Sequence, residues 1–575
     1  MANRIPIGTD DFRKVREEKL EYIDKSDFIR QVIERQGVEV MLLPRPRRFG
    51  KSLNLSMLRY WFEKREENLA HLFQDLSIWS AGDEIRRHFQ KYPVIYFNFK
   101  ESQQPDFERA LDAIKKKIEN AFLQHEYLLQ SEKLSEWQIR DFRAILDRTA
   151  SLASYERAIL ELSAYLRAHH GQRVIILIDE YDEPIHAGHA HGYAPQIIDF
   201  MRSFLGAALK SNEHLGKAVI TGILRVAKEN LFSGLNNIGV YSLLDKEFNT
   251  AFGFTDDEVT SLLDRYGRSD KLADVRAWYN GYLFGGEVIY NPWSILSYLE
   301  REDAIPKPYW VGTSSNELIH ELLETYAIKL DHVLEDLLEG RSIETYLDEN
   351  INLSELPTND DALFSLLVFS GYLKADPMPY DPIVGRLAYR LSIPNREVRE
   401  VYASTFQRWI KSHLGAQGGD VGKLARAILS GDDETFEEQL QKFVLNVLAH
   451  YDVARLDPER VYHGFVLGLL AAVEPEYLVR SNHESGSGRP DVTIRPRLAG
   501  KPGALLELKL ARKGKKTPAA ALREGLAQIR SKGYAADLWA TGVSDVHAFA
   551  VAFDGKRVWV KASEPGDKKK GKGKK

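Results

Sequence analysis

The stretch VEVMLLPRPRRFGKSLNLSMLRYWFEK, residues 38–64, decides the fold of the N-terminal half. The apolar run at 38–43 predicts a buried strand, and the pattern after Ser52 predicts a helix. Between them lies a tight loop that ends in Gly50, Lys51 and Ser52. A phosphate-binding loop needs this order, because the helix N-terminus supplies oriented N–H groups, the lysine neutralises phosphate charge and the hydroxyl can ligate Mg²⁺.

The loop departs from the usual Gly-x4-Gly-Lys-Ser spacing at one position. Arg45 stands where the first glycine is expected, and Arg47 and Arg48 stand where small residues are common. With only Gly50 in place, the loop has less backbone freedom than a standard one. A Gly-Lys-Ser tripeptide alone could equally belong to an ordinary surface loop, so this assignment depends on a second motif.

The second motif is the strand candidate RVIILID at 173–179, which ends in Asp179 and is followed by Glu180. Carboxylates at the C-terminal end of a buried parallel strand lie at the sheet edge where ligands bind. There Asp179 would hold Mg²⁺ through water, and Glu180 would orient or deprotonate the attacking water. A further strand candidate, 93–99, lies between the two motifs, an arrangement typical of ATPases with an additional catalytic glutamate.

The strand candidate KAVITGIL at 217–224 is followed by Arg225. We interpret Arg225 either as a γ-phosphate contact, since arginine offers permanent planar charge, or as an ordinary surface residue. The alternation of apolar strands with helical patterns predicts an α/β domain with a parallel sheet. ATP and Mg²⁺ are the cofactors expected at the nucleotide site, which comprises Arg47, Arg48, Gly50, Lys51, Ser52, Asp179, Glu180 and Arg225.

A second constellation lies near the C-terminus, on two strand candidates of a smaller α/β region. Asp491 opens the strand DVTIRP, and Glu507 and Lys509 stand in the apolar strand ALLELKL. Residues two apart in a strand share a face, so Glu507 and Lys509 point together while Leu508 enters the core. Buried charges need partners, and a divalent cation held by Asp491 and Glu507 would supply one. Lys509 would then orient the attacking water or stabilise developing charge; an edge strand with a solvated Glu-Lys face is the alternative.

Two pairs of residues accompany this constellation. Glu459 and His463 are four apart on a predicted helix at 458–473, so they share a face, and either can complete the metal site or be a plain surface residue. Gln528 and Tyr534 lie at the end of a predicted helix at 518–533.

Composition sets the outer limits of these interpretations. At 575 residues the chain exceeds what one core serves. The lack of cysteine excludes thiolate chemistry and disulfides and favours a reducing, cytoplasmic location, and no apolar run or leader predicts a membrane segment. Because the net charge is −5, nucleic acid must meet a local basic surface. The lysine-rich end is either a solvated tail or a phosphate-binding arm.

We predict four regions: 1–300, a mainly helical 301–450, 451–562, and a disordered basic tail at 563–575.

Several stretches resemble an AAA-ATPase-like family that is fused to PD-(D/E)xK nuclease domains in many prokaryotic proteins. Over about residues 5–300 the resemblance is carried by PRPRRFGKSLNLSML, ILIDEYDEPI, TGILRVAKENLFSGLNN, FGFTDDEV, WYNGYLFG and YNPWSI. It implies that Arg45 is a family trait. Tyr22, Asp24 and Lys25 match the family's Tyr-x-Asp-Lys-Ser/Thr pattern near the start of the chain. The two aromatic stretches are expected mainly to pack beneath the ATPase.

Residues 455–561 resemble the PD-(D/E)xK domain that accompanies this family, through YHGF, SNHESGSGRPDV and LLELK. Gln528 and Tyr534 are similar to the accessory motif of RecB-like nucleases, at a longer spacing. The resemblance implies a P-loop (ASCE-type) ATPase domain, a helical middle region and a restriction-endonuclease-like α/β domain. It further implies an ATP-dependent or ATP-regulated nuclease with one Mg²⁺ site per module and, by association, a role in antiviral defence.

Two other functions stay open on the sequence. One is an ATP-driven switch or scaffold whose nuclease-like domain binds nucleic acid without cutting it. The other is a nuclease that cuts RNA, since no recognition module separates DNA from RNA, although DNA is favoured. A homo-oligomer is also left open.

Overall fold

The computed structural model divides into two compact units, Met1–Ser314 with Glu344–Val398, and Ser315–Ile343 with Arg399–Lys575. Among the residues that it describes, no helix has the length and apolar content needed to cross a bilayer. The described residues are 3–210, 212–225, 231, 237–310, 333, 337, 340–351, 353, 356, 359–380, 385–402, 419–447, 462, 466, 469–470, 476–481, 490–511, 516–532, 534–540, 542–555 and 557–563.

The first unit is built on a five-stranded parallel sheet in the order β2-β3-β4-β1-β5. Its strands are β1 (Val40–Pro44), β2 (Val94–Asn98), β3 (Val174–Asp179), β4 (Leu215–Gly222) and β5 (Ile238–Val240). Every residue of β1 and β3 is buried, which explains their uninterrupted apolar runs. The predicted parallel sheet is therefore confirmed.

The strand that lies between β1 and β3 in this sheet is β4. The strand at 93–99, here β2, intervenes only along the chain and forms one edge of the sheet. Parallel strands are joined by long crossovers, so the order in the sequence does not dictate which strands become neighbours.

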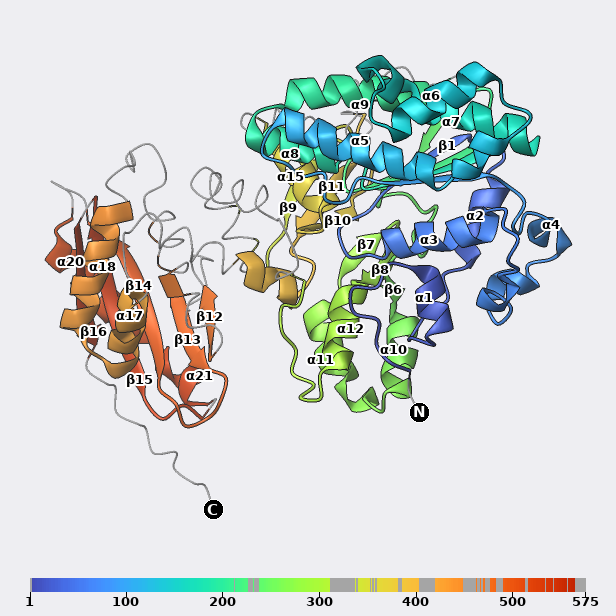
Figure 1. The fold of residues 1–575 in the computed structure, drawn as a ribbon. Coiled ribbons are helices and arrows are strands. Elements are labelled where there is room, and N and C mark those ends of the chain that lie inside the picture. The colour runs from blue at the N-terminus through green and yellow to red at the C-terminus, as the bar shows by residue number, and fades with distance from the viewer. Residues whose placement is uncertain are drawn as a thin grey trace. The chain divides into compact units, whose positions relative to one another are not determined.

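Helices cover both faces of the sheet. Figure 1 shows α5 (Phe107–Leu123), α7 (Leu152–His170) and α9 (Ala194–Leu209) on one face and α3 (Lys51–Phe62) on the other. The helical pattern expected at 105–170 is confirmed, since α5 and α7 flank a further helix there. The remaining helices of this part are α1 (Phe12–Glu17), α2 (Asp27–Glu34), α4 (Asp83–Arg86), α6 (Glu136–Leu146) and α8 (Glu183–His191).

A small antiparallel sheet with the order β6-β8-β7 follows, where the sequence suggested short helices with aromatic connections. The stretch WYNGYLFG enters β7, and Gly285 and Gly286, both with positive φ, turn the chain into β8. Two residues with positive φ suit a tight hairpin turn, and glycine takes that conformation without steric cost. The elements are β6 (Phe254–Thr255), α10 (Asp256–Arg265), α11 (Leu272–Tyr279), β7 (Tyr282–Phe284), β8 (Glu287–Tyr290) and α12 (Pro292–Glu300).

The middle of the chain is helical but also contains a three-stranded sheet in the order β10-β11-β9. The sequence predicts one short strand in this region, near 386–393, which corresponds to β11. The two compact units divide the region after Ser314, Ile343 and Val398, and a separate domain at 301–450 stays a prediction. Its described elements are β9 (Ile343–Tyr346), α15 (Asp360–Phe369), β10 (Lys374–Pro377), β11 (Ala388–Ser392), α17 (Gly419–Ser430) and α18 (Asp433–Val447).

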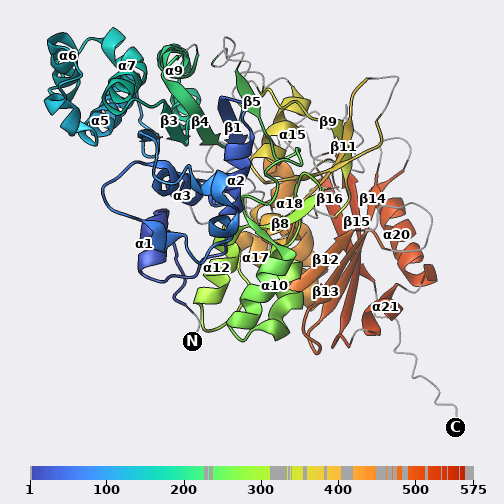
Figure 2. The same ribbon diagram turned by 90° about the vertical axis from the view of Figure 1, so that its right-hand side faces the viewer.

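The second unit contains a five-stranded mixed sheet in the order β12-β13-β14-β15-β16, in which β14 and β15 are parallel. The patterns EYLVRSN, PDVTIRP, GALLELKLA, HAFAVAFDG and KRVWVKA each predict a strand, and all five strands are present. Helices α17 and α18 share a core with one face, and α20 and α21 cover the other (Figure 2). The predicted helix at 458–473 lies largely outside the described residues. The elements are β12 (Tyr477–Ser481), β13 (Val492–Pro496), β14 (Gly503–Leu510), α20 (Pro518–Lys532), α21 (Ala535–Trp539), β15 (Val546–Asp554) and β16 (Arg557–Ser563).

The edge strand β16 is protected by side chains of α18. Three acceptors spaced four residues apart on α18 bind alternate N–H groups of β16, at 2.7–3.1 Å. The pairs are Asp433 with Ala562, Glu437 with Val560, and Gln441 with Val558. Capping an edge in this way prevents it from pairing with another chain.

Glu397, near the end of the first unit, is a fully buried carboxylate. It accepts hydrogen bonds from the Ser294 hydroxyl at 2.7 Å and from the Trp310 N–H at 2.8 Å. Burial raises the pKa of the Glu397 carboxyl to about 7.

This buried carboxyl should make the first unit less stable as the pH rises. A folded-state pKa above the unfolded value means that the folded chain binds the extra proton, so stability is full below about pH 4.5 and is lost towards pH 7. Between pH 5 and pH 8 the parent should lose up to about 3 kcal/mol more than Glu397→Gln, which cannot ionise. Thermal melting of both full chains at the two pH values measures the difference, and parallel curves would contradict the assignment.

Candidate nucleotide and nuclease sites

The loop after β1 presents the N-terminus of α3 with no side chain capping it. Gly50 is the N-cap residue, with a φ of 86°, and makes no side-chain hydrogen bond to the helix. The Lys51 ammonium is almost fully buried and donates to the carbonyl oxygens of Arg45 at 3.1 Å and Pro46 at 3.2 Å. Free helix N–H groups beside a buried cation are what a phosphate group requires, so these residues fit a nucleotide.

Asp179, the last residue of β3, connects the loop to two other strands. Its carboxylate accepts hydrogen bonds from the Ser52 hydroxyl at 2.5 Å, the Thr221 hydroxyl at 2.6 Å and the Asn98 amide at 3.2 Å. Burial, and then the charge of Glu180, raise the pKa of Asp179 to about 6, against the effect of the two hydroxyls. Ser52 and Asp179 are thus brought together as a Mg²⁺ site would need. Sequence reasoning missed Asn98, whose only signal was its place at the end of β2.

Glu180 adopts a left-handed backbone conformation, with a φ of 52°. For a residue other than glycine this costs on the order of 1 kcal/mol or more, and such strain concentrates at functional sites. Its carboxylate lies 3.6 Å from the Lys51 ammonium. The strained turn therefore places the predicted catalytic carboxylate beside the predicted phosphate-binding lysine.

Arg45 explains how the loop dispenses with its first glycine. Arg45 has no positive φ, and its side chain is fully buried within the domain. The guanidinium donates to the carbonyl oxygens of Pro44 at 2.7 Å, Tyr241 at 2.8 Å and Phe248 at 3.2 Å. An ordinary φ removes the need for glycine, and the side chain ties the loop to the segment after β5.

Arg47 and Arg48 lie against the start of α12. The Asn291 amide donates to the Arg47 carbonyl oxygen at 3.4 Å, and the Arg48 guanidinium stacks 4.3 Å from the Trp293 ring. Burial, and then Arg47, lower the pKa of Arg48. The YNPWS stretch therefore packs on the phosphate loop itself.

Arg225 is half-buried in the coil that follows β4. No contact described in the structure joins Arg225 to Lys51 or Asp179. The backbone that leads to it is fixed by Asp182, a buried carboxylate that accepts the N–H groups of Ile223 at 2.8 Å and Leu224 at 2.9 Å. Sequence reasoning missed this role of Asp182.

The other family-like stretches also pack around the loop. The Gly253 N–H donates to the Phe49 carbonyl oxygen at 3.0 Å, and the Phe49 ring lies 5.0 Å from that of Tyr282. The Lys25 ammonium binds the Glu258 carboxylate at 2.7 Å, so the N-terminal Tyr-x-Asp-Lys pattern anchors α10. The structural packing expected for the aromatic stretches is what the structure shows.

Asp491, Glu507 and Lys509 come together on one face of the second sheet. Lys509 Nζ lies 2.7 Å from Glu507 Oε1, and the Leu508 N–H donates to Asp491 Oδ2 at 2.7 Å. Leu508 enters the core of the opposite face, as the period of two predicts. Burial, and then Asp491, raise the pKa of Glu507 to about 7.

The buried oxygen Glu507 Oε2 has no hydrogen-bond partner. An orphaned carboxylate oxygen beside a second carboxylate fits a divalent cation, which would supply Lewis-acid activation of water or phosphate. In the described part of the chain, no group of three or more potential ligands could hold a metal. The predicted additional ligands Glu459 and His463 lie outside the described residues.

Helix α20 closes over this cluster. A Cβ placed on Gly525 would lie 2.9 Å from the Ala550 Cβ and 3.6 Å from both Glu507 Cγ and Lys509 Cγ, so the close approach depends on glycine. One turn further on, the Gln528 amide donates to the Tyr534 hydroxyl at 3.2 Å. The predicted accessory pair is therefore in contact, and Gly525 was missed because sequence alone does not show which helical glycine faces a sheet.

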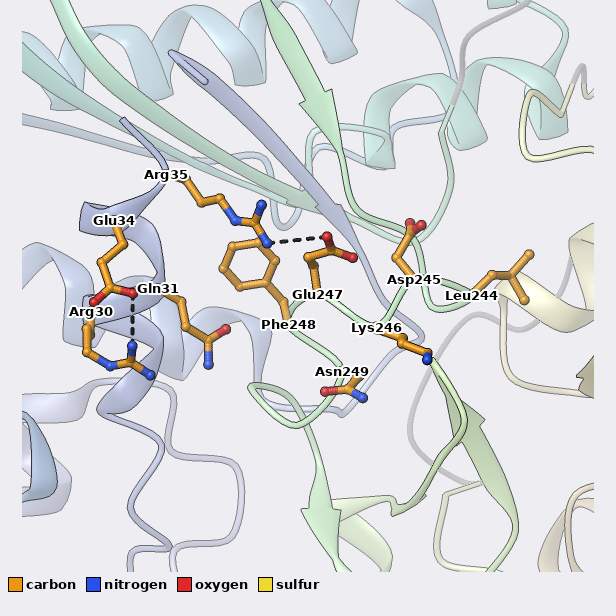
Figure 3. A pocket seen from close by; sticks show the side chains of 10 residues that line it. All are labelled: Arg30, Gln31, Glu34, Arg35, Leu244, Asp245, Lys246, Glu247, Phe248 and Asn249. Carbon is orange, nitrogen blue, oxygen red and sulfur yellow. Dashed lines mark hydrogen bonds and ion pairs between the residues drawn. The ribbon is translucent and has the colours of Figure 1, made fainter. Parts of the chain in front are cut away.

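A separate pocket of about 860 Å³ lies between α2 and residues 244–249 (Figure 3). Four of its charged side chains form two ion pairs, with Arg35 3.3 Å from Glu247 and Arg30 2.8 Å from Glu34. None of the predicted nucleotide-site residues lines it.

Comparison with known proteins finds a matching family model for each of the two domains. Residues 6–232 match the family model described as predicted AAA-ATPase, and residues 457–563 match that of the PD-(D/E)XK nuclease superfamily. The chain thus joins an ATPase-like domain, which implies nucleotide binding, to a nuclease-superfamily domain, which implies nucleic-acid binding. It is also 28% identical over 563 residues to the "Uncharacterized protein in vnfD 5'region" of Azotobacter chroococcum mcd 1, with 96% of each chain covered.

The geometry of the loop separates nucleotide binding from hydrolysis. Lys51→Ala should lower ATP affinity at least about tenfold, because the ammonium held at the helix N-terminus is lost. Glu180→Gln should retain binding and slow hydrolysis. Titration with a fluorescent ATP analogue and phosphate release measure the two effects, with the exposed Lys64→Ala as control. ATP binding by Lys51→Ala as tight as the parent's would refute the loop assignment.

Proposed function

We propose that this protein is an ATP-dependent or ATP-regulated, metal-dependent nuclease that cleaves phosphodiester bonds, with DNA as the favoured substrate and Mg²⁺ at both sites. The observation that carries the proposal is the buried Glu507 carboxylate, which has one oxygen paired with Lys509 and the other without a partner, beside Asp491. Burying these charged groups costs free energy unless they have partners. A bound cation would balance the two carboxylates, and a phosphate group would interact with Lys509.

In this proposal the residues of the chain divide the work of cleavage. Asp491 and Glu507 would hold the metal ion, which activates water when bound. Lys509, fixed by its ion pair with Glu507, would orient that water or stabilise charge on the phosphate. The combination of the two domains is what supports a proposed role in defence against foreign nucleic acid.

The competing function is an ATP-driven switch that binds nucleic acid without cutting it. The complete set of Asp491, Glu507 and Lys509 favours cleavage over this alternative. Incubation of the full chain with plasmid DNA, single-stranded DNA and total RNA, each with and without ATP, tests both the reaction and the choice of substrate. Binding without cleavage under every condition would favour the switch.

Removal of the metal site should abolish cleavage and spare the ATPase. Asp491→Asn and Lys509→Ala should each lower the cleavage rate by about 100-fold or more, with the ATPase rate within about twofold of the parent, because the two sites lie in different units. EDTA should have the same effect on cleavage. Lys532→Ala, at the end of α20, is the matched control. Cutting that survives EDTA and both substitutions would disprove the metal-dependent mechanism.

A chain of contacts supports control of the nuclease by nucleotide. Arg48 stacks on Trp293 at the start of α12, and the neighbouring Ser294 binds Glu397. The first unit ends one residue later, at Val398, where the chain passes into the unit that carries the nuclease-like sheet. A change in the phosphate loop can therefore reach the junction through α12.

If this connection operates, ATP should alter cleavage or nucleic-acid affinity by about 5-fold or more, a coupling of roughly 1 kcal/mol. Lys51→Ala should abolish the effect of ATP, and Ser294→Ala should reduce it while ATP binding is retained. Cleavage rates and nucleic-acid affinities of the three proteins, with and without ATP, provide the test. Equal values under all conditions would mean two independent enzymes in one chain.

A further inference from the structure

The described helices cover only part of the face of the second sheet that carries the candidate nuclease cluster. Tyr477, Val479, Val492 and Ile494 belong to the core on the opposite face. By the period of two, Arg480 of β12 and Thr493 and Arg495 of β13 must lie on the same face as Glu507 and Lys509. Helix α20 packs on β14, β15 and β16 of this face.

Among the described elements, no helix packs closely on β12 and β13 on this face, and these two strands carry two arginines without described partners. Arg480 is exposed and Arg495 is half-buried. Among the described residues, neither guanidinium has a carboxylate or other polar partner, whereas the cluster lysine, Lys509, is paired. Unpaired guanidinium groups beside the cluster can bind phosphate, because arginine donates two parallel hydrogen bonds to phosphate oxygens.

The strand register sets the distances of these arginines from the cluster. Arg480 pairs with Thr493, two residues from Asp491, and Arg495 lies two residues further along β13. At about 3.3 Å per residue, the row from Asp491 to Arg495 is about 13 Å long, roughly four nucleotides of a B-form strand. Along the strand direction, the two cations therefore lie about 7 Å and 13 Å from Asp491, within the span of a few nucleotides.

We propose that Arg480 and Arg495 form a phosphate-binding strip on the open face of β12 and β13, which holds the nucleic-acid backbone beside the scissile bond. The proposal rests on the nuclease function proposed above, and it assigns the substrate-binding surface. The strip recognises backbone phosphate, so DNA and RNA share its chemistry and the experiment must distinguish them.

Binding of labelled 20-nucleotide duplex DNA and single-stranded RNA to the full chain tests this strip, in the Asp491→Asn background to prevent cutting. Arg480→Ala/Arg495→Ala should lower affinity at least tenfold for one or both probes and reduce the salt slope of log K by about 2. Arg480→Lys/Arg495→Lys should retain the slope, which excludes a folding defect. In the cleaving chain, the alanine pair should raise KM and leave kcat within about twofold.

Arg523→Ala/Arg530→Ala, which removes two arginines from the exposed side of α20, is the matched control and should change neither quantity. Unchanged affinity and salt slope in the Arg480→Ala/Arg495→Ala chain would overturn the strip, and so would an equal loss in the control. If Asp491→Asn still abolishes cleavage, the proposed nuclease function survives that failure. A parent chain that binds neither probe would overturn both proposals.

Discussion

The buried carboxylate of Asp179 joins the phosphate loop of the first unit to two strands of its sheet. It is fully buried, and it accepts hydrogen bonds from side chains of α3, β2 and β4. A buried carboxylate is costly unless such donors surround it, so the phosphate loop and the two neighbouring strands are held in one arrangement. The strained Glu180 follows directly, and its conformation persists because the residue before it cannot move.

The second unit also has a buried carboxylate, but that carboxylate has fewer hydrogen-bond donors around it. Glu507 is as inaccessible as Asp179, yet one of its oxygens has no hydrogen-bond partner. Asp179 is therefore satisfied mainly by the protein, whereas Glu507 is left incomplete in a way that suits a cation. Because of this contrast, the unpaired Glu507 oxygen is the clearer structural sign of a bound cation.

The loop between β1 and α3 shows how one unusual residue is accommodated. Arg45 replaces a glycine, and its two terminal guanidinium nitrogens donate to carbonyl oxygens of the segment after β5. Phe49, Arg47 and Arg48 make contacts with stretches some 200 residues later in the chain. The aromatic stretches thus act as a support for the loop, and through Ser294 and Glu397 they extend that support to the end of the unit.

Local pattern determined much of this protein by itself. Apolar runs located the strands of both large sheets except the three-residue β5, Gly-Lys-Ser located the start of α3, and the period of two placed Glu507 with Lys509 and Leu508 in the core. These inferences depend on neighbours in the sequence, and so they need no knowledge of the fold. The small sheets were mostly missed because their strands are two to five residues long, too short to show a period.

Only the tertiary structure decided which distant residues meet. It inserted β4 between β1 and β3, buried Arg45, paired Lys25 with Glu258, brought Asn98 to Asp179 and closed α20 over Glu507 at Gly525. It also joined residues 344–398 to the first unit. Each of these outcomes depends on the path of the connections between strands and on which polar groups are buried together. The spacing of residues along the chain determines neither of them.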